Sequence, residues 1–262
     1  ENYFLLMLFV CSSARSQLGT PFLNNFSPHQ YKGHPQVWCI IQDKLGMIYL
    51  GNAPGVLQYD GVSWRMIKNS NGSIARSLAV DNNGRIYSGC QSDLGYLEPG
   101  ETGDLKFISL KDSIPAENRD FDDVWRTYVS GNGVFFQTNK YLFRWHDKKM
   151  KVWKAKTEFQ LSYQVFDWFY ITEKNFGLEQ VVGDSLYPVS NGDFFSDKRI
   201  YTMMPFNTAD LLIGTREHGL FVYDGIKPVP FKSDVNEYVI THQLYAGTKL
   251  PNGNYAIATI RK

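Results

Sequence analysis

Short apolar runs separated by turns rich in Gly, Asp and Asn follow one another along most of the chain. Within residues 36–67, the turn Asp43-Lys-Leu-Gly46 suits type I geometry, with Asp at its first and Gly at its last position. Further along, Asp60-Gly61 is a strong signal for a two-residue hairpin. The pattern predicts four strands in this segment, and similar runs recur to the end of the chain.

The first segment is the first copy of a repeat. Its motif D-x-x-G-x-I-Y-x-G occurs at 43–51 and returns at 81–89. Four strands in about 40 residues is the size of a β-propeller blade. We expect a degenerate fourth unit and an incomplete sixth, with the units at 36–67, 74–110, 122–155, 159–190, 198–231 and 239–262. The residues expected to build the turns are Asp43, Gly46, Asp81, Gly84, Gly133 and Gly253.

The predicted fold is all-β: a β-propeller of four-stranded blades, with about five and a half blades in an incomplete, open arc of a seven-bladed ring. A β-sandwich is the alternative, although it would not need a matching motif in each unit. The nearly apolar first strands fit sheets stacked between neighbours, so blade interfaces should supply most of the stability. The two terminal blade faces should be exposed and prone to aggregation.

The N-terminus is predicted to be a signal peptide, residues 1–16, followed by a lead-in segment over 17–35. The apolar run 3–11 is too short to span a bilayer, and small residues precede a cleavage point placed after Ser16. A buried first strand is the alternative, and Val10 weakens a lipoprotein reading at Cys11. Because the chain lacks an initial Met and ends inside a strand-like run, we expect a fragment of a longer exported protein.

Composition narrows the picture further. The chain is 43% hydrophobic and 15% aromatic, which favours one large core, and its net charge is +1 with scattered Lys and Arg. Without a basic stripe, nucleic-acid binding by this segment is not expected. In an oxidising compartment Cys39 and Cys90 could form a disulfide. The favoured interpretation is that the two residues are unpaired and serve as small buried hydrophobes.

The repeat resembles the two-component regulator propeller repeat, D-x-x-G-x-[IW]-[YW]-x-G followed by Y-D-G. The lead-in over 21–38 looks like the start of the periplasmic sensor region of triple-tyrosine-motif regulators. The resemblance covers 18–262 and is strong in units one, two and five. It implies a membrane-bound signalling protein of Gram-negative bacteria, with a transmembrane helix and a histidine kinase or LuxR-type transcription regulator output beyond this segment. It also implies a homodimer, and some such relatives sense oligosaccharides.

Motifs for catalysis or metal binding are not found in the sequence. The five histidines have no H-x-x-x-H or H-E-x-x-H spacing, and no nucleophile elbow or phosphate loop occurs. The cluster Asp120, Asp122 and Asp123 is half of a calcium or glycosidase-type site, but a solvated loop is favoured. We therefore expect no metal, no cofactor and no enzymatic activity in this segment.

One register position predicts a binding site. A large side chain lies eight residues before the turn Gly in four units, and a large side chain also lies at the matching position of unit five. These residues are Trp38, Arg76, Trp125, Tyr201 and Tyr245. This position is near the start of the innermost strand, which lines the channel of a propeller. Aromatic faces and Arg forks suit sugar rings and anionic groups, although packing between blades is the alternative for all five.

The function predicted from these features is periplasmic ligand sensing for a membrane-bound signalling regulator, with an oligosaccharide or other small ligand. Two alternatives remain open. One is a secreted propeller enzyme acting on polysaccharide, and the other is a scaffold for protein interaction or dimerisation.

Overall fold

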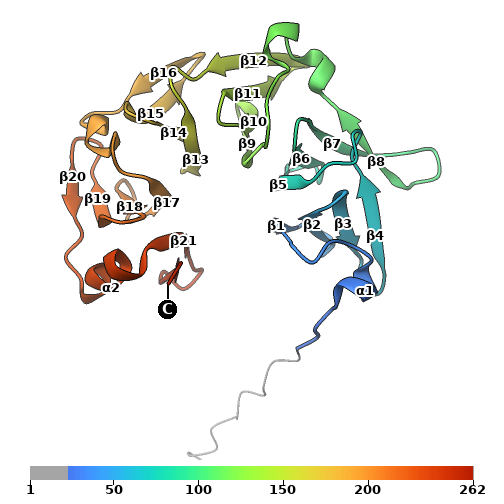
Figure 1. Cartoon of the computed structure of the whole chain (residues 1–262), viewed down its shortest axis with the longest axis horizontal. Coiled ribbons are helices and arrows are strands. Elements are labelled where there is room, and N and C mark those ends of the chain that lie inside the picture. The colour runs from blue at the N-terminus through green and yellow to red at the C-terminus, as the bar shows by residue number, and fades with distance from the viewer. Residues whose placement is uncertain (1–22, 262) are drawn as a thin grey trace, which may run out of the picture.

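A computed structural model describes residues 23–261, so the predicted signal peptide and its cleavage point lie outside the described residues. Five four-stranded antiparallel sheets and one two-stranded sheet follow one another around an open arc (Figure 1). Within each sheet the strands hydrogen-bond in chain order, and the first strand of each lies on the inside of the arc. The predicted propeller of stacked blades is confirmed.

We call these sheets blades 1 to 6. Blade 1 contains β1 (Cys39–Gln42), β2 (Ile48–Asn52), β3 (Gly55–Tyr59) and β4 (Trp64–Lys68). Blade 2 contains β5 (Ala75–Val80), β6 (Ile86–Cys90), β7 (Leu94–Pro99) and β8 (Leu105–Ser109). Blade 3 contains β9 (Arg126–Ser130), β10 (Gly133–Gln137), β11 (Tyr141–His146) and β12 (Lys149–Lys154). Blade 4 contains β13 (Phe159–Val165), β14 (Trp168–Glu173), β15 (Gly177–Val182) and β16 (Ser185–Pro188). Blade 5 contains β17 (Ile200–Pro205), β18 (Leu211–Thr215), β19 (Gly219–Tyr223) and β20 (Pro228–Pro230). Blade 6 contains β21 (Leu244–Lys249) and β22 (Tyr255–Thr259).

Five short helical segments lie outside the blades. They are α1 (Pro28–Tyr31), the 3₁₀ turns η2 (Lys111–Ser113), η3 (Ala116–Asn118) and η4 (Gly192–Phe195), and α2 (Asp234–His242). The sequence placed the start of blade 6 near Val239, but that residue lies in α2 and is fully buried. Its side chain packs with Leu220 and Leu244, so the apolar run that predicted a strand is the inward face of a helix.

The repeated Asp residues close the first turn of blades 1 and 2. The Asp43 carboxylate accepts hydrogen bonds from the backbone N–H groups of Leu45 (2.9 Å) and Met47 (3.0 Å), and Asp81 makes the equivalent pair. Gly46 has φ +86°, a left-handed conformation that a side chain would strain. These residues therefore hold turns together.

The Asp60-Gly61 hairpin differs from its prediction. Tyr59 pairs with Trp64, so the loop has four residues instead of two. The Asp60 carboxylate explains the longer loop, because it accepts hydrogen bonds from the N–H groups of Val62 (2.8 Å) and Ser63 (2.6 Å). The degenerate fourth unit nevertheless forms a complete sheet.

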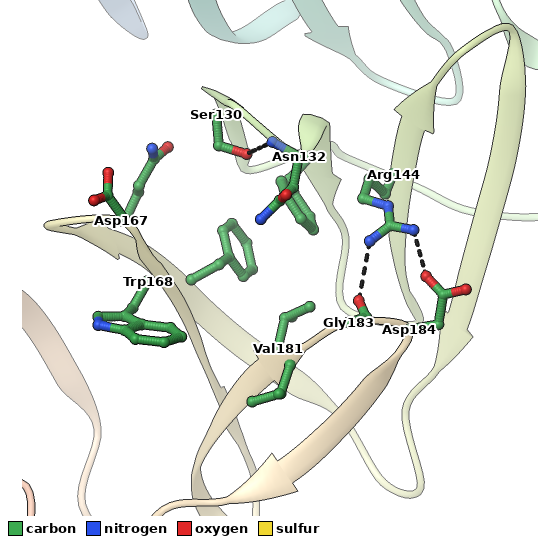
Figure 2. A pocket seen from close by; sticks show the side chains of 12 residues that line it. Ser130, Asn132, Arg144, Asp167, Trp168, Val181, Gly183 and Asp184 are labelled. Carbon is green, nitrogen blue, oxygen red and sulfur yellow. Dashed lines mark hydrogen bonds and ion pairs between the residues drawn. The ribbon is translucent and has the colours of Figure 1, made fainter.

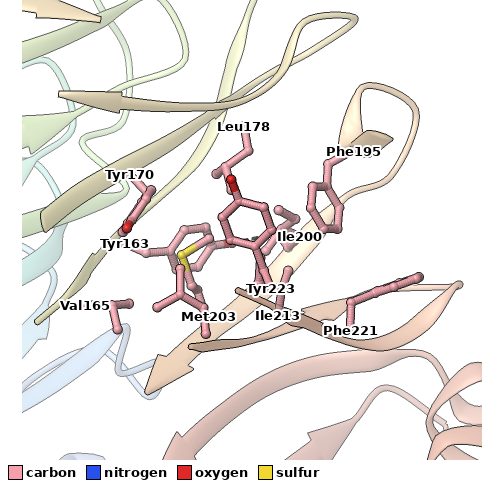
Figure 3. Packing of buried hydrophobic residues seen from close by; sticks show 11 residues of the cluster. Tyr163, Val165, Tyr170, Leu178, Phe195, Ile200, Met203, Ile213, Phe221 and Tyr223 are labelled. Carbon is pink, nitrogen blue, oxygen red and sulfur yellow. Dashed lines mark hydrogen bonds between the residues drawn. The ribbon is translucent and has the colours of Figure 1, made fainter. Parts of the chain in front are cut away.

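Apolar side chains fill the space between neighbouring blades. Figure 3 shows the cluster between blades 4 and 5, in which Tyr163 and Leu178 face Ile213 and Phe221. Phe195, from η4 in the connection between the two blades, is 2% exposed and enters the same cluster. The Tyr163 hydroxyl donates to the carbonyl oxygen of Ile200 (2.8 Å) and so ties the two sheets together.

Both cysteines in the described chain have free thiols. Cys39 and Cys90 pack in the core between blades 1 and 2. Burial raises the pKa of Cys39 to about 12 and that of Cys90 to about 11. The two residues pack as small hydrophobes, as the sequence favoured, with Cys90 buried and Cys39 partly buried.

The lead-in segment covers part of the free face of blade 1. Phe26 makes edge contacts with Tyr59 and Trp64, at centroid distances of 5.1 and 5.3 Å. The buried Asn52 side chain donates to the carbonyl oxygens of His34 (2.8 Å) and Gln36 (3.0 Å). The expectation of a bare terminal face is therefore wrong for the outer strands of this blade. On the inner strand Ile40 is 66% exposed.

Candidate functional site

The five predicted channel-mouth residues lie at or just before the starts of inner strands, all at one end of the blades. The structure brings them together in two groups and not as one ring. Trp38, Arg76 and Trp125 form the first group, across blades 1 to 3. Tyr201 and Tyr245 form the second, with ring centroids 6.2 Å apart across blades 5 and 6.

The first group surrounds one guanidinium. The Arg76 Cζ atom lies 3.7 Å from the ring centroid of Trp38 and 5.2 Å from that of Trp125. Its Nε donates to Asp123 Oδ1 at 2.7 Å, and the two side chains are only 10% and 13% exposed. The Arg76 guanidinium is therefore paired with a carboxylate and packed against two indole rings inside the protein, which is consistent with the alternative of packing between blades.

Asp123 was expected in a solvated loop, and that interpretation is wrong for this residue. It forms an isolated bridge with Gln91 and supplies the counter-charge for Arg76. Its neighbour Asp120 does lie in solvent, where it pairs with Lys140 at 2.9 Å. The two carboxylates therefore take different roles although they are three residues apart.

The fourth blade contributes a residue that the sequence did not reveal. The backbone bonds from Lys174 N to Glu158 O and from Arg216 N to Arg199 O, both 2.9 Å, fix the same register in blades 4 and 5. Two residues after Glu158 comes Gln160, which therefore holds the position that Tyr201 holds in blade 5. The degenerate motif of this unit hid it, because there is no turn Gly from which to count.

Gln160 lines a cavity of about 380 Å³ at this end of blades 4 and 5. Lys174 comes from the β14–β15 turn, Arg216 from the β18–β19 turn, and Arg199 from the connection that precedes β17. The Arg216 Cζ atom lies 6.0 Å from the ring centroid of Tyr201. Tyr201 does not line the cavity, but it lies beside Arg216, which does.

Cations outnumber carboxylates in the lining of this cavity, three to two. Its two carboxylates are engaged: Asp197 pairs with Lys198 at 2.6 Å, and Glu217 lies 3.8 Å from Arg216. Lys174 and Arg199 have no ion-pair partner within residues 23–261. Three cations from three separate segments and the amide of Gln160 line one cavity, which is an arrangement suited to an anionic group.

Two buried carboxyl groups lie next to the wall of the cavity. Glu173 and Glu179 are 2% and 1% exposed. Glu173 Oε1 accepts from Thr157 N at 2.6 Å, Glu179 Oε1 accepts from Lys156 Nζ at 2.9 Å, and Glu179 Oε2 is buried without a hydrogen-bond partner. The Thr157 hydroxyl donates to the carbonyl oxygen of Lys174, so this network holds a residue that lines the cavity.

Burial raises the pKa of Glu179, and Lys156 offsets part of that effect. The folded protein then holds this proton more tightly than the unfolded chain does. The stabilisation is fully present below the ordinary Glu pKa of about 4.5 and is lost as pH rises through the raised pKa.

We therefore expect Glu179→Gln to gain stability relative to the wild type as pH rises from 4.5 to 8, because Gln keeps the shape and does not titrate. Thermal melting across this range measures the difference. The exposed Glu101→Gln is the matched control and should show no such trend. If the difference in melting temperature between Glu179→Gln and wild type stayed constant with pH, the raised pKa of Glu179 would be contradicted.

Comparisons with known proteins support the fold. No family model matches the chain, and no curated protein matches it. Catalytically inactive virginiamycin B lyase from Staphylococcus aureus, solved with quinupristin, is similar in structure, with a TM-score of 0.58, 11% identity, and coverage of 86% of this chain and 84% of that one. BBS1N in complex with ARL6DN has a TM-score of 0.59 at 10% identity, covering 86% and 74%. At these identities the likeness concerns the propeller fold.

The extracellular domain of a protein described as a hybrid two-component system, BT4673 from B. thetaiotaomicron, is also similar. Its TM-score is 0.49 at 15% identity, covering 86% of this chain. This chain spans 37% of the length of that domain. Within residues 23–261, no helix has the length and apolarity needed to cross a membrane. The propeller fold thus occurs in a lyase and in a domain that forms a complex, so the function is argued from the site.

Proposed function

We propose that this chain is the periplasmic ligand-sensing propeller of a membrane-bound bacterial signalling regulator. The observation that carries the proposal is the cationic cavity of blades 4 and 5, which is lined by Lys174, Arg199 and Arg216, with Tyr201 beside Arg216. The repeat motif and the lead-in support it, because both resemble the sensor regions of two-component regulators. In this proposal the full-length sensor acts as a homodimer, and membrane anchoring comes from outside this segment.

The ligand that this cavity suits carries a carboxylate or sulfate group on a small ring system, such as an acidic sugar. The cations would bind the acidic group, and Tyr201 would pack against an apolar ring face. The cavity of about 380 Å³ falls within the ordinary range of small-molecule sites. A secreted enzyme acting on polysaccharide is the second candidate, because Glu217 and His218 also line this cavity.

Calorimetric titration of the chain with acidic and neutral oligosaccharides tests the proposal. We expect an acidic ligand to bind, and the double variant Lys174→Gln, Arg199→Gln to weaken binding about tenfold or more, since each charged hydrogen bond is worth about 1.5–3 kcal/mol. The control is Lys106→Gln, which removes an exposed cation in β8 of blade 2, outside the cavity. If the double variant bound the ligand as tightly as Lys106→Gln does, the proposed site would be wrong. Steady consumption of the ligand would favour the second candidate, an enzyme acting on polysaccharide.

A further inference from the structure

The end of α2 is hydrogen-bonded to a residue that lines the cationic cavity. Gln243 follows α2 directly and precedes β21, so it stands between the helix and blade 6. Its side-chain oxygen Oε1 accepts hydrogen bonds from Nε and Nη2 of Arg216, at 3.3 and 3.2 Å. Arg216 lines the cavity, whereas Gln243 does not. A neutral amide outside the cavity therefore holds a guanidinium in its wall.

The same amide stands between Arg216 and a carboxylate. Gln243 Nε2 donates to Glu217 Oε1 at 3.3 Å, while Glu217 Oε1 lies 3.8 Å from Arg216 Nε, which is beyond hydrogen-bond distance. Without the amide, the Glu217 carboxylate would be able to pair with Arg216 directly, since the two residues are adjacent in the chain. Gln243 thus satisfies part of the guanidinium without cancelling its charge.

Arg144 shows the opposite arrangement, in a second cavity of about 230 Å³ between blades 3 and 4 (Figure 2). Its Nη1 donates to the carbonyl oxygen of Gly183 at 3.0 Å, and its Nη2 donates to the carboxylate of Asp184. Both terminal nitrogens are used, and the charge is matched. In Arg216 the bonded atoms are Nε and Nη2, and Nη1 makes no hydrogen bond with residues 23–261. A guanidinium has five N–H groups, so Arg216 keeps three, along the edge formed by Nη1 and Nη2.

The backbone of Gln243 supports a specific role for its side chain. Its φ is +58°, which favours Gly at the end of a helix. The conformation is held from both sides, because Leu244 N donates to Arg216 O at 3.1 Å and Ile260 N donates to Gln243 O at 2.8 Å. Glycine would fit this backbone with less strain, so a long amide at this position points to what the amide binds.

We propose that Gln243 is a positioning residue for the anionic ligand of the cationic cavity, holding Arg216 so that its Nη1–Nη2 edge receives a carboxylate. Two parallel N–H groups on one edge of a guanidinium match the two oxygens of a carboxylate. The inference rests on the function proposed above and adds to it the way in which the acidic group is bound. It also makes α2 and blade 6 part of the site, although no residue of either lines the cavity.

NMR of the chain tests the positioning without any ligand. The Arg216 Nε–H signal, assigned by its loss in Arg216→Lys, should be protected from exchange with water in the wild type. Gln243→Met keeps the length of the side chain but lacks the amide oxygen, and Gln243→Gly removes the side chain. Both variants should lose the protection. Gln243→Gly should still melt near the wild-type temperature, because relief of the positive φ offsets the lost hydrogen bonds.

Calorimetric titration with glucuronate tests the consequence for binding, with glucose as the neutral probe. Both Gln243 variants should bind glucuronate about 2- to 12-fold more weakly than the wild type, the range expected for one net hydrogen bond. Lys148→Gly is the matched control, because Lys148 has the same φ of +58° and is exposed in the turn between β11 and β12. This variant should leave glucuronate binding unchanged.

The outcomes separate this inference from the proposed function. The inference alone is overturned if the Arg216 Nε–H stays protected in both Gln243 variants. It is also overturned if these variants bind glucuronate as the wild type does while the double variant Lys174→Gln, Arg199→Gln binds it weakly. If the wild type binds no glucuronate, or if the double variant binds it as tightly as the wild type, the proposed function is wrong and the inference fails with it.

Discussion

Phe195→Ala should lower the free energy of unfolding by about 3–5 kcal/mol, because it removes a fully buried ring and leaves a cavity between two blades. Phe195 lies in η4, outside both sheets, and its ring meets Phe221 of blade 5 at a centroid distance of 5.9 Å (Figure 3). Neither blade can fill the space by moving alone, so relaxation should be limited. Urea denaturation followed by circular dichroism measures the loss.

Phe194→Ala provides the control for this prediction. Phe194 is the adjacent residue and makes edge contacts with Phe195 and Phe221, at 5.1 and 5.2 Å, but it is partly exposed. Its removal should cost clearly less than that of Phe195. If the two variants were equally unstable, the buried cluster between blades 4 and 5 would not be the main contact between them.

Asp123→Ala should cost about 3 kcal/mol, near the lower end of the range for breaking a buried ion pair. The variant leaves the Arg76 guanidinium between two indole rings without its counter-charge, and Arg76 Nη1 already lacks a partner. Replacing both partners in Arg76→Met, Asp123→Leu should recover most of the loss, because no charge is then left buried. The same urea titration measures both variants.

Asp120→Ala is the control for the ion pair. Asp120 pairs with Lys140 in solvent, so its loss should have little effect. A double variant as unstable as Asp123→Ala would mean that Arg76 contributes through its contacts with Trp38 and Trp125 rather than through its charge.

The repeat made the blades predictable because it encodes local geometry. Asp43 and Gly46 form their turn from residues within five positions of one another, so the sequence alone specifies it. The apolar first strands likewise predict sheets buried on both faces. Even blade 4, with its motif eroded, follows from its position between complete neighbours.

Features that depend on distant partners were not predictable. Arg76 meets Asp123 across 47 positions of sequence, and no local pattern distinguishes Asp123 from the exposed Asp120. The cationic cavity takes Lys174 and Arg216 from two turns and Arg199 from the connection before β17, and no pattern in the sequence links these three positions. The same limit explains α2, because the sequence predicted the start of blade 6 near Val239, whereas this residue is buried on the inward face of a helix that Ser233 caps.

The covering of blade 1 by the lead-in has a consequence for how the chain folds. Blade 1 has blade 2 on one face and a segment from the start of the chain on much of the other. Its apolar surface can therefore be buried as soon as the first two blades have been synthesised. In a repeat protein, folding can begin at any unit and spread to its neighbours. The early burial of blade 1 favours nucleation there, with later blades adding in the order in which they emerge during synthesis.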